Sequence, residues 1–262
     1  MATTVAEIRE MLKHANADEF EALDRSLAAD TRKGVRTALE AARRRIASEE
    51  SERLRLKALR EFDRSHVPDG SSGMVVGLDE VGRGAVAGPL AVGAVVLPSE
   101  YAIADLNDSK QLTAEQREAV AANVKQIALA WTVAYVEPAD IDRDGMSLSL
   151  RKAFKQALGN VEAQGINPEV VLIDGNPLGI DPREVNVVKG DSKSASIAAA
   201  SVVAKVERDK LMGELSSTFP QYGFSDNKGY ASEQHRDAIR EQGLTPIHRR
   251  SFCTSFLQES LF

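Results

Sequence analysis

The sequence contains a single cysteine, Cys253, among 262 residues. An internal disulfide is therefore excluded, and this content is typical of proteins from a reducing cytosol. Long hydrophobic runs are also missing: the longest, residues 85–97, is too short to span a bilayer and contains Gly88 and Pro89. The first residues lack the cationic start and apolar core of a signal peptide. We therefore expect a cytoplasmic protein with no membrane partner.

Positive charge is scarce as well, because 33 Lys and Arg residues stand against 39 Asp and Glu, for a net charge of −6. This balance disfavours a protein that coats nucleic acid through bulk electrostatics. It leaves open an enzyme with a local basic groove beside a cluster of metal-binding acids, since such acids make the net charge misleading. The hydrophobic fraction of 43% is ordinary for a globular protein, so a folded domain is expected.

Proline is absent from residues 1–65, and Gly34 is their only glycine, so this segment is predicted to be helical. Thr3 or Thr4 can cap the first helix, and Glu7 stands where a capping box with Thr4 requires it. A second helical periodicity runs from about residue 31 to residue 64.

The composition changes at the linker-like stretch of residues 68–73. We therefore divide the chain into a helical N-terminal extension, residues 1–68, and a larger α/β domain, residues 69–262, with a C-terminal helical part from about residue 205. In the larger domain, short apolar runs predict strands and periodic runs predict helices. Strands are expected at residues 74–79, 91–97, 129–137, 168–175 and 185–191, and helices at residues 114–128, 148–165 and 194–219.

Four carboxylates come at or just after the carboxyl ends of predicted strands: Asp79, Glu80, Asp174 and Asp191. Ligands gather at that edge in open α/β sheets. Hard oxygen ligands at this density suit Mg²⁺ or Mn²⁺ better than zinc. Two such ions can clamp a phosphodiester, so the pattern indicates metal-dependent phosphodiester hydrolysis.

Each acid also has a purely structural interpretation. Asp174 with Gly175 is a common turn pair, and Asp191 precedes a helix that it could cap. Glu80 faces away from Asp79 in a regular strand, so both can reach one site only if the strand ends or bulges near residues 81–82.

Six motifs in this order closely resemble bacterial ribonuclease HII: "GLDEVGRGAVAGPLAVGAVVL", "NDSKQL", "VLIDGNPL", "VVKGDSKSASIAAASVVAKVERD", "NKGY" and "HRRSF". They extend from about residue 75 to residue 252, and the helical segment before residue 70 resembles the N-terminal extension of some family members. The resemblance implies a ribonuclease H-like fold, a mixed sheet flanked by helices. It also implies endonucleolytic cleavage of RNA in RNA–DNA hybrids, including single ribonucleotides embedded in duplex DNA. The implied products are a 3′-hydroxyl and a 5′-phosphate, and the implied cofactor is Mn²⁺ or Mg²⁺.

The metal-binding carboxylates of that family fall on Asp79, Glu80, Asp174 and Asp191. Its glycine-arginine-glycine element, which with a tyrosine reads the ribose 2′-hydroxyl, falls on Gly82, Arg83 and Gly84, and the tyrosine on Tyr230. We expect phosphate contacts from Lys110, Lys193, Ser192 and Ser194, each with a surface or helix-capping role as the alternative. His248 and Arg249 could lie near the site or serve a structural hydrogen bond.

One departure concerns the residues after Tyr230, where the family is expected to have glycine and threonine and this chain has Ala231 and Ser232. This puts the pose of Tyr230 in question. Two other functions stay open: a ribonuclease HIII-like enzyme that needs longer runs of RNA, and a non-catalytic hybrid-binding module. The helical N-terminus and the "DEVGRG" spelling argue against the first, and the presence of all four acids argues against the second. We expect a monomer.

Overall fold

The computed structural model describes residues 3–258, with side chains through residue 254. The chain divides into two compact units, residues 1–58 and 59–262. The division falls inside the long helix α3 (Lys33–Arg64), whose last turn therefore belongs to the larger unit.

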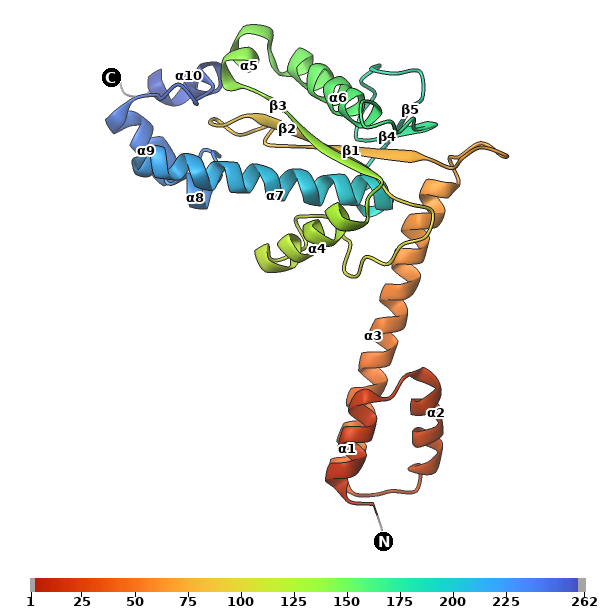
Figure 1. Cartoon of the computed structure of the whole chain (residues 1–262). Coiled ribbons are helices and arrows are strands. Elements are labelled where there is room, and N and C mark those ends of the chain that lie inside the picture. The colour runs from red at the N-terminus through yellow and green to blue at the C-terminus, as the bar shows by residue number, and fades with distance from the viewer. Residues whose placement is uncertain (1–2, 259–262) are drawn as a thin grey trace. The chain divides into compact units, whose positions relative to one another are not determined.

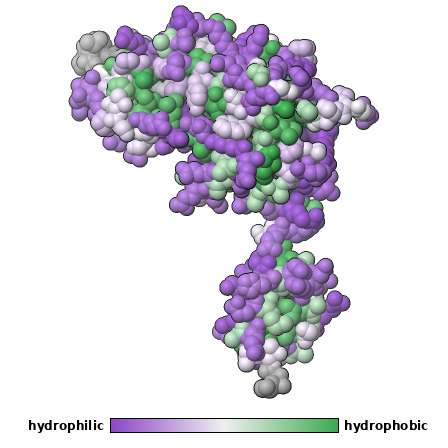
Figure 2. All heavy atoms as spheres, in the orientation of Figure 1, coloured by the Kyte–Doolittle hydropathy of each residue, from purple (hydrophilic) through white to green (hydrophobic). Residues whose placement is uncertain are grey.

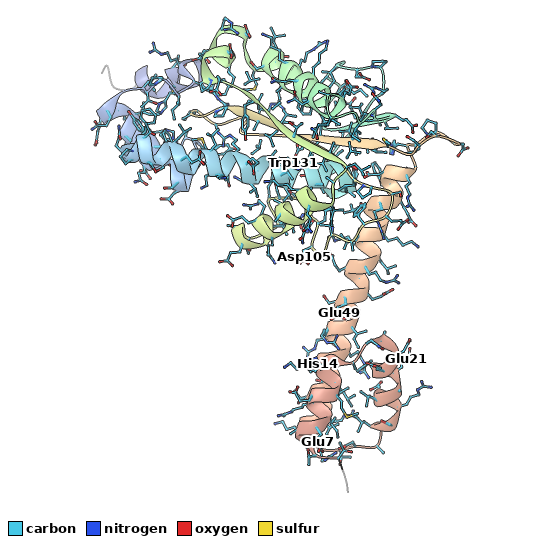
Figure 3. All side chains as sticks on the ribbon, in the orientation of Figure 1. Glu7, His14, Glu21, Glu49, Asp105 and Trp131 are labelled. Carbon is cyan, nitrogen blue, oxygen red and sulfur yellow. The ribbon has the colours of Figure 1, made fainter. Side chains whose placement is uncertain are left out.

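The smaller unit consists of α1 (Val5–His14), α2 (Ala17–Ser26) and the first part of α3. The predicted capping box of α1 is confirmed: the Thr4 hydroxyl accepts from the backbone of Glu7, and the Glu7 carboxylate accepts from the backbone of Thr4. Apolar residues of all three helices form its core, among them Ile8, Leu12 and Leu39. Their outer faces carry exposed polar residues, so that hydrophilic atoms surround the apolar ones in Figure 2 and Glu21 lies outside the core in Figure 3.

The larger unit contains a five-stranded mixed sheet with the strand order β3-β2-β1-β4-β5 (Figure 1). The strands are β1 (Val75–Val81), β2 (Leu90–Val96), β3 (Ala130–Val136), β4 (Val170–Asp174) and β5 (Glu184–Val187). The first three pair antiparallel, whereas β4 runs parallel to both β1 and β5. The sheet is thus mixed, as the resemblance to the ribonuclease HII family implied.

Helices cover both faces of this sheet (Figure 1). On one face, α6 (Met146–Glu162) packs against β2 and β3, and α5 (Pro138–Asp144) precedes it. On the other, α7 (Ala195–Thr218) packs against β1 and β2, with α4 (Ala114–Ile127) beside it. The α7 backbone approaches so closely that a Cβ atom on Gly77 would lie 2.1 Å from the carbonyl carbon of Ser196. The alanines of α7 permit this approach.

The chain after α7 forms a helical group around Tyr222 and Phe224, and its apolar core includes Met212 of α7. It contains α8 (Phe224–Asn227), α9 (Glu233–Gln242) and α10 (Arg250–Gln258), with the short 3₁₀ turn η2 (Pro220–Tyr222) before them. An isolated bridge between Ala87 and His248 connects this group to the loop after β1. Among residues 3–258, no helix is long and apolar enough to cross a membrane.

Candidate active site

The carboxyl ends of β1 and β4 bring two acids together. The two strands are parallel neighbours, and Leu78 pairs with Ile173. The next residue of each strand is an acid, Asp79 and Asp174, so the pairing carries both to one edge of the sheet. This is the edge at which the sequence predicted a carboxylate cluster.

Asp79 and Asp191 are the most buried of these acids, each with 7% of its surface exposed. In the case of Asp79, burial has a large effect on the carboxylate. Its Oδ1 accepts from the backbone N–H of Glu80 at 2.8 Å, and the Ser201 hydroxyl donates to the same carboxylate. Burial is the main cause that raises its pKa to about 8, and the charges of Glu80, Asp174 and Asp191 raise it further. The carboxylate therefore sits in a place that disfavours its own negative charge unless a cation compensates.

Glu80 pairs regularly with Val92, and β1 ends one residue later at Val81. Gly82 then adopts a φ of +81°, so the chain leaves the sheet at residues 81–82. The strand has to end at this position if Asp79 and Glu80 are to reach the same site. Burial raises the pKa of Glu80, and the charge of Asp174 adds to this effect while Arg83 opposes it. The Arg83 guanidinium lies 3.5 Å from Oε1 of Glu80.

Asp191 does not end a strand, contrary to the sequence prediction, because β5 stops at Val187. Lys189 takes a left-handed conformation with φ 56°, and Asp191 lies in the 3₁₀ turn η1 (Gly190–Ser192) that follows. The turn is tied to β4, because the backbone N–H of Gly190 donates to Oδ1 of Asp174 at 2.6 Å. Tertiary contact therefore brings Asp191 to the acid edge.

Burial raises the pKa of Asp191, with the charges of Asp108 and Asp174 adding to the shift. Lys110 opposes that shift, and its Nζ lies 3.6 Å from Oδ2 of Asp191. The expected phosphate-binding lysine is thus present at the acid edge, with its side chain largely exposed.

The donor chemistry of the four acids fits a hard divalent cation, since every candidate ligand is a carboxylate oxygen. The mutual repulsion of the acids also fits a cation site, because the charge of Asp174 raises the pKa of each of the other three acids. As placed, however, no three His, Cys, Asp or Glu side chains in the described ranges converge as ligands of one ion. Cation binding at this edge would therefore require some of these side chains to adopt other rotamers.

The loop after β1 lies against the segment that carries Tyr230. The backbone N–H groups of Val86 and Ala87 both donate to the carbonyl of Gly229, at 2.8 and 3.1 Å. Tyr230 is 40% exposed. The structure therefore brings the glycine-arginine-glycine element and Tyr230 into one neighbourhood, although Gly84 and Tyr230 are 146 positions apart in the sequence.

Two buried histidines support the backbone of Tyr230. Nδ1 of His248 accepts from the N–H of Thr245 at 3.0 Å, so Nε2 must carry the proton of the neutral ring. That proton is donated to Nε2 of His235, 3.1 Å away, and Nδ1 of His235 then donates to the Tyr230 carbonyl at 2.8 Å. The role of His248 is thus a structural hydrogen bond.

The substitution of Ala231 for the expected glycine introduces no backbone strain, because Ala231 is not among the residues with positive φ. Ser232 caps α9 by accepting from the backbone of His235, and its own N–H donates to the Tyr230 carbonyl at 2.8 Å. The turn after Tyr230 is therefore compatible with the residues present here.

The remaining predicted contacts differ in accessibility. Ser192 and Lys193 are exposed beside Asp191, in the region where a phosphate contact was expected. Ser194 is fully buried and caps α7 by accepting from the N–H of Ile197 at 3.1 Å. Ser194 therefore has the helix-capping role that we gave as the alternative to a phosphate contact. Asp191 does not cap α7.

Sequence reasoning missed Arg208 and left the role of Arg249 open, although both arginines are 0% exposed. Arg208 had a detectable signal. It follows Ala200 and Ala204 at intervals of four along α7, the face on which Gly93 meets the helix. An arginine on the buried face of an alanine-rich helix indicates a specific set of buried acceptors.

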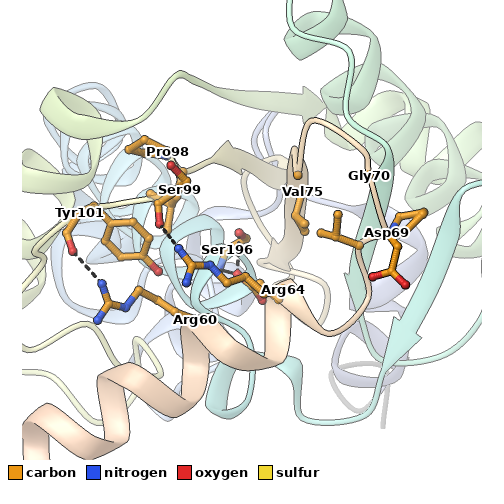
Figure 4. Close-up of a pocket in the computed structure, with 14 residues that line it drawn as sticks. Arg60, Arg64, Asp69, Gly70, Val75, Pro98, Ser99, Tyr101 and Ser196 are labelled. Atoms are coloured by element: carbon orange, nitrogen blue, oxygen red, sulfur yellow. Dashed lines mark hydrogen bonds between the residues drawn. The ribbon is translucent and has the colours of Figure 1, made fainter.

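A pocket of about 320 Å³ lies at the amino end of β1, lined by the last turn of α3 and the loop after β2 (Figure 4). Arg60 donates to the carbonyl of Tyr101, and Arg64 to that of Ser99. At its wall, Oδ2 of the buried Asp63 accepts from the N–H and hydroxyl of Ser196, at 2.9 and 2.8 Å. The pocket contains none of the four acids, and its contacts anchor the start of α7.

The mixed sheet with helices on both faces places the protein in the ribonuclease H-like class. The model of the family Ribonuclease HII matches residues 76–255, and that of the Ribonuclease HII N-terminal domain matches residues 4–66. The chain belongs to the ribonuclease HII family. It is therefore a metal-dependent endoribonuclease that cleaves RNA in RNA–DNA hybrids.

Individual relatives agree with this assignment. Ribonuclease HII of Halalkalibacterium halodurans is 38% identical over 250 residues, which cover 95% of this chain and 93% of that protein. Ribonuclease HII of Listeria monocytogenes is 36% identical over 97% of this chain and 95% of its own length. Among solved structures, ribonuclease H2 from Pyrococcus horikoshii has a TM-score of 0.60 and 27% identity, covering 71% of this chain and 98% of that one.

A more distant structure, Bst-RNase HIII in complex with Mn²⁺, shares the fold with a TM-score of 0.55 and 21% identity. It covers 72% of this chain and 70% of that one.

Proposed function

We propose that this enzyme hydrolyses the phosphodiester on the 5′ side of a ribonucleotide, including a single ribonucleotide embedded in duplex DNA. The products are a 3′-hydroxyl and a 5′-phosphate. The observation that carries the proposal is Asp79, a buried carboxylate whose pKa is raised to about 8 beside three further acids. Burial of an ionised carboxylate lowers the stability of the fold, and a bound cation would compensate its charge.

Asp79, Glu80, Asp174 and Asp191 are the residues that would hold Mn²⁺ or Mg²⁺. When bound, the cations supply an activated water and stabilise the charge on the leaving oxygen. Lys110 lies beside Asp191 and is positioned to contact a non-bridging oxygen of the scissile phosphate. Ser192 and Lys193, exposed beside the same acid, are proposed to contact neighbouring phosphates of the backbone.

Recognition of the ribonucleotide is assigned to Gly82, Arg83, Gly84 and Tyr230. The ribose 2′-hydroxyl is the group that distinguishes RNA from DNA, and it can both donate and accept. Backbone groups of two glycines can approach it closely because no Cβ intervenes. The exposed Tyr230 ring offers a flat surface to the adjacent sugar and a phenol that can form a hydrogen bond.

The test is cleavage of a DNA duplex that contains one ribonucleotide, with Mn²⁺ or Mg²⁺ present and with EDTA as the metal-free control. We expect metal-dependent incision 5′ to the ribonucleotide. Cleavage confined to a long RNA–DNA hybrid would favour the ribonuclease HIII-like alternative. If neither substrate is cut and Mn²⁺ does not bind, the non-catalytic hybrid-binding module is favoured instead.

The tyrosine is tested separately with Tyr230→Ala. We expect this variant to lose preference for a lone ribonucleotide while its affinity for Mn²⁺, measured by calorimetry, stays close to that of the wild type. A variant that loses Mn²⁺ affinity but keeps its substrate preference would show that the role of Tyr230 is misassigned.

A further inference from the structure

Arg208 and Arg249 are both fully buried, and neither forms an ion pair with a carboxylate in the described part of the chain. A buried cation without an anion is unfavourable unless hydrogen bonds satisfy its donors. Here the two guanidinium groups make six hydrogen bonds, and every acceptor is a backbone carbonyl. The acceptors belong to the loop after β1 and to the segment before Tyr230. The arginines therefore act on the backbone at the proposed ribonucleotide-recognition element.

Arg249 holds both ends of that loop. Its Nε and one terminal nitrogen donate to the carbonyl of Gly88, at 3.0 and 2.9 Å. The other terminal nitrogen donates to the carbonyl of Arg83 at 3.0 Å. Because the peptide bonds are trans, the N–H of Gly84 points away from the carbonyl of Arg83. With that carbonyl directed at the buried guanidinium, the Gly84 N–H is directed outward.

The Gly84 N–H is also available. Gly84 is exposed, and among the residues that the structure describes its N–H has no hydrogen-bond partner. The peptide plane of this exposed donor is fixed by the hydrogen bond from Arg249 to the Arg83 carbonyl. The donor is therefore preorganised, and less conformational entropy is lost when it binds an acceptor on a ligand.

Arg208 joins the loop to the segment that carries Tyr230. Its three donating nitrogens reach the carbonyls of Pro89, Ala87 and Lys228, at 2.9, 3.2 and 2.9 Å. Its guanidinium carbon lies 5.8 Å from the centre of the Tyr230 ring, within the range of a cation–π contact. One side chain thus contacts both parts of the proposed recognition element.

We propose that Arg249 and Arg208 are positioning residues for recognition of the ribose 2′-hydroxyl: Arg249 orients the Gly84 N–H, and Arg208 sets Tyr230 relative to the loop. This inference rests on the proposed function of the same element. Lysine keeps the charge but cannot reproduce the planar fork that bonds two or three carbonyls at once. The arginines should therefore determine which substrate is selected rather than whether metal binds.

The kinetic test compares Arg249→Lys and Arg208→Lys with Arg250→Lys, a neighbouring exposed arginine. The measured quantity is kcat/KM for a duplex with one ribonucleotide divided by kcat/KM for a long RNA–DNA hybrid. We expect this ratio to fall about tenfold in each buried variant, the effect of roughly one misplaced hydrogen bond, and to stay unchanged in Arg250→Lys. An unchanged ratio in variants with a wild-type melting temperature would overturn the proposal. Wild-type protein that cuts only the long hybrid would instead refute the proposed function.

A second readout does not depend on activity, and it is applied to variants whose amide spectrum without DNA shows that they are folded. Protein labelled with ¹⁵N-glycine is titrated, in EDTA, with a duplex carrying one ribonucleotide and with the same duplex made entirely of DNA. We expect the Gly84 amide signal to move further with the ribonucleotide, and this difference to disappear in Arg249→Lys. If Arg249→Lys retains the wild-type difference, Arg249 does not position Gly84 and the proposal fails.

Discussion

A Cβ atom on Gly82 would lie 2.2 Å from Nε of Arg208. The glycine also has a φ of +81°, a region that other L-residues rarely adopt. The turn after β1 and the buried arginine beneath it are therefore mutually dependent. The turn can form only where no side chain occupies the place of the guanidinium, and the guanidinium reaches its carbonyl acceptors only through that turn.

Gly82→Ala is expected to lower the free energy of unfolding by about 2–5 kcal/mol, because it combines backbone strain with a clash against a group that has no room to move. Urea unfolding at neutral pH measures this change. A loss below about 0.5 kcal/mol, the size of an ordinary surface substitution, would show that the turn adapts.

Gly84→Ala should behave differently, although Gly84 is only two positions away. No atom lies within 4 Å of a Cβ built on Gly84, and its φ is outside the left-handed region. We expect stability within about 0.5 kcal/mol of the wild type. Cleavage of a duplex with one ribonucleotide should nevertheless fall by about tenfold or more, since the added methyl group stands beside the N–H proposed to face the sugar. Unchanged cleavage would argue that Gly84 does not approach the substrate.

Asp79→Asn is expected to nearly abolish cleavage while leaving the fold intact. The substitution removes a charged metal ligand, and it also removes a carboxylate whose burial raises its pKa to about 8. A raised pKa means that the folded state binds the proton more tightly than the unfolded state, so stability is lost as the pH rises from about 4, and the loss is complete above about pH 8. In EDTA, the variant should therefore be at least as stable as the wild type at pH 9.

Single-turnover kinetics and Mn²⁺ calorimetry check this variant. Cleavage within about threefold of the wild type, a barrier change below roughly 1 kcal/mol, would contradict the assigned role of Asp79.

Asp63→Ala should lower the free energy of unfolding of the larger unit by about 1–3 kcal/mol, because two buried donors of Ser196 would lose their acceptor. The matched control is Asp69→Ala, an exposed acid that lines the same pocket. Differential scanning calorimetry of both variants separates the two cases. Equal melting temperatures would show that Asp63 does not anchor α7.

Acid should destabilise the protein through the two buried histidines. Burial, together with the charge of His235, lowers the pKa of His248 to about 4, and burial also lowers the pKa of His235. Unfolded histidine titrates near pH 6.5, so between pH 6.5 and 4 the unfolded chain binds more protons than the folded one. The stabilising contribution is thus fully present above about pH 6.5 and is lost as the pH falls toward 4.

His248→Gln isolates this contribution from the carboxylates of the acid edge, whose raised pKa values act in the opposite direction. Thermal unfolding from pH 7 to pH 4.5 should show a smaller pH-dependent loss in the variant, by at most about 3 kcal/mol. Identical slopes for the variant and the wild type would exclude His248 as the source.

Much of the local structure follows from short-range pattern. The capping box of Thr4 and Glu7 depends on residues three positions apart, and the helix from residue 33 to residue 64 depends on the absence of interior proline. The four acids could be proposed because apolar strands precede three of them directly and the fourth closely. These features depend on contacts between near neighbours, whose spacing is visible in the chain itself.

Other features depended on segments that are far apart in sequence. Asp191 is brought to the acid edge by the bond from Gly190 to Asp174, in a turn that the strand prediction had not anticipated. Arg208 and Pro89 are separated by 119 positions, and Arg249 and Gly88 by 161, so no local pattern could pair them.

The amino-acid sequence by itself therefore determined most of the helices and strands, the four acids and the family to which the chain belongs, because these are recorded in spacing and in motifs. Only the tertiary structure decided which carbonyls the two buried arginines hold, which tautomers the paired histidines take and which way the Gly84 N–H faces. The physical reason is that a buried polar group must find its partner wherever folding brings one, and that partner is defined by position in space rather than by position in the chain.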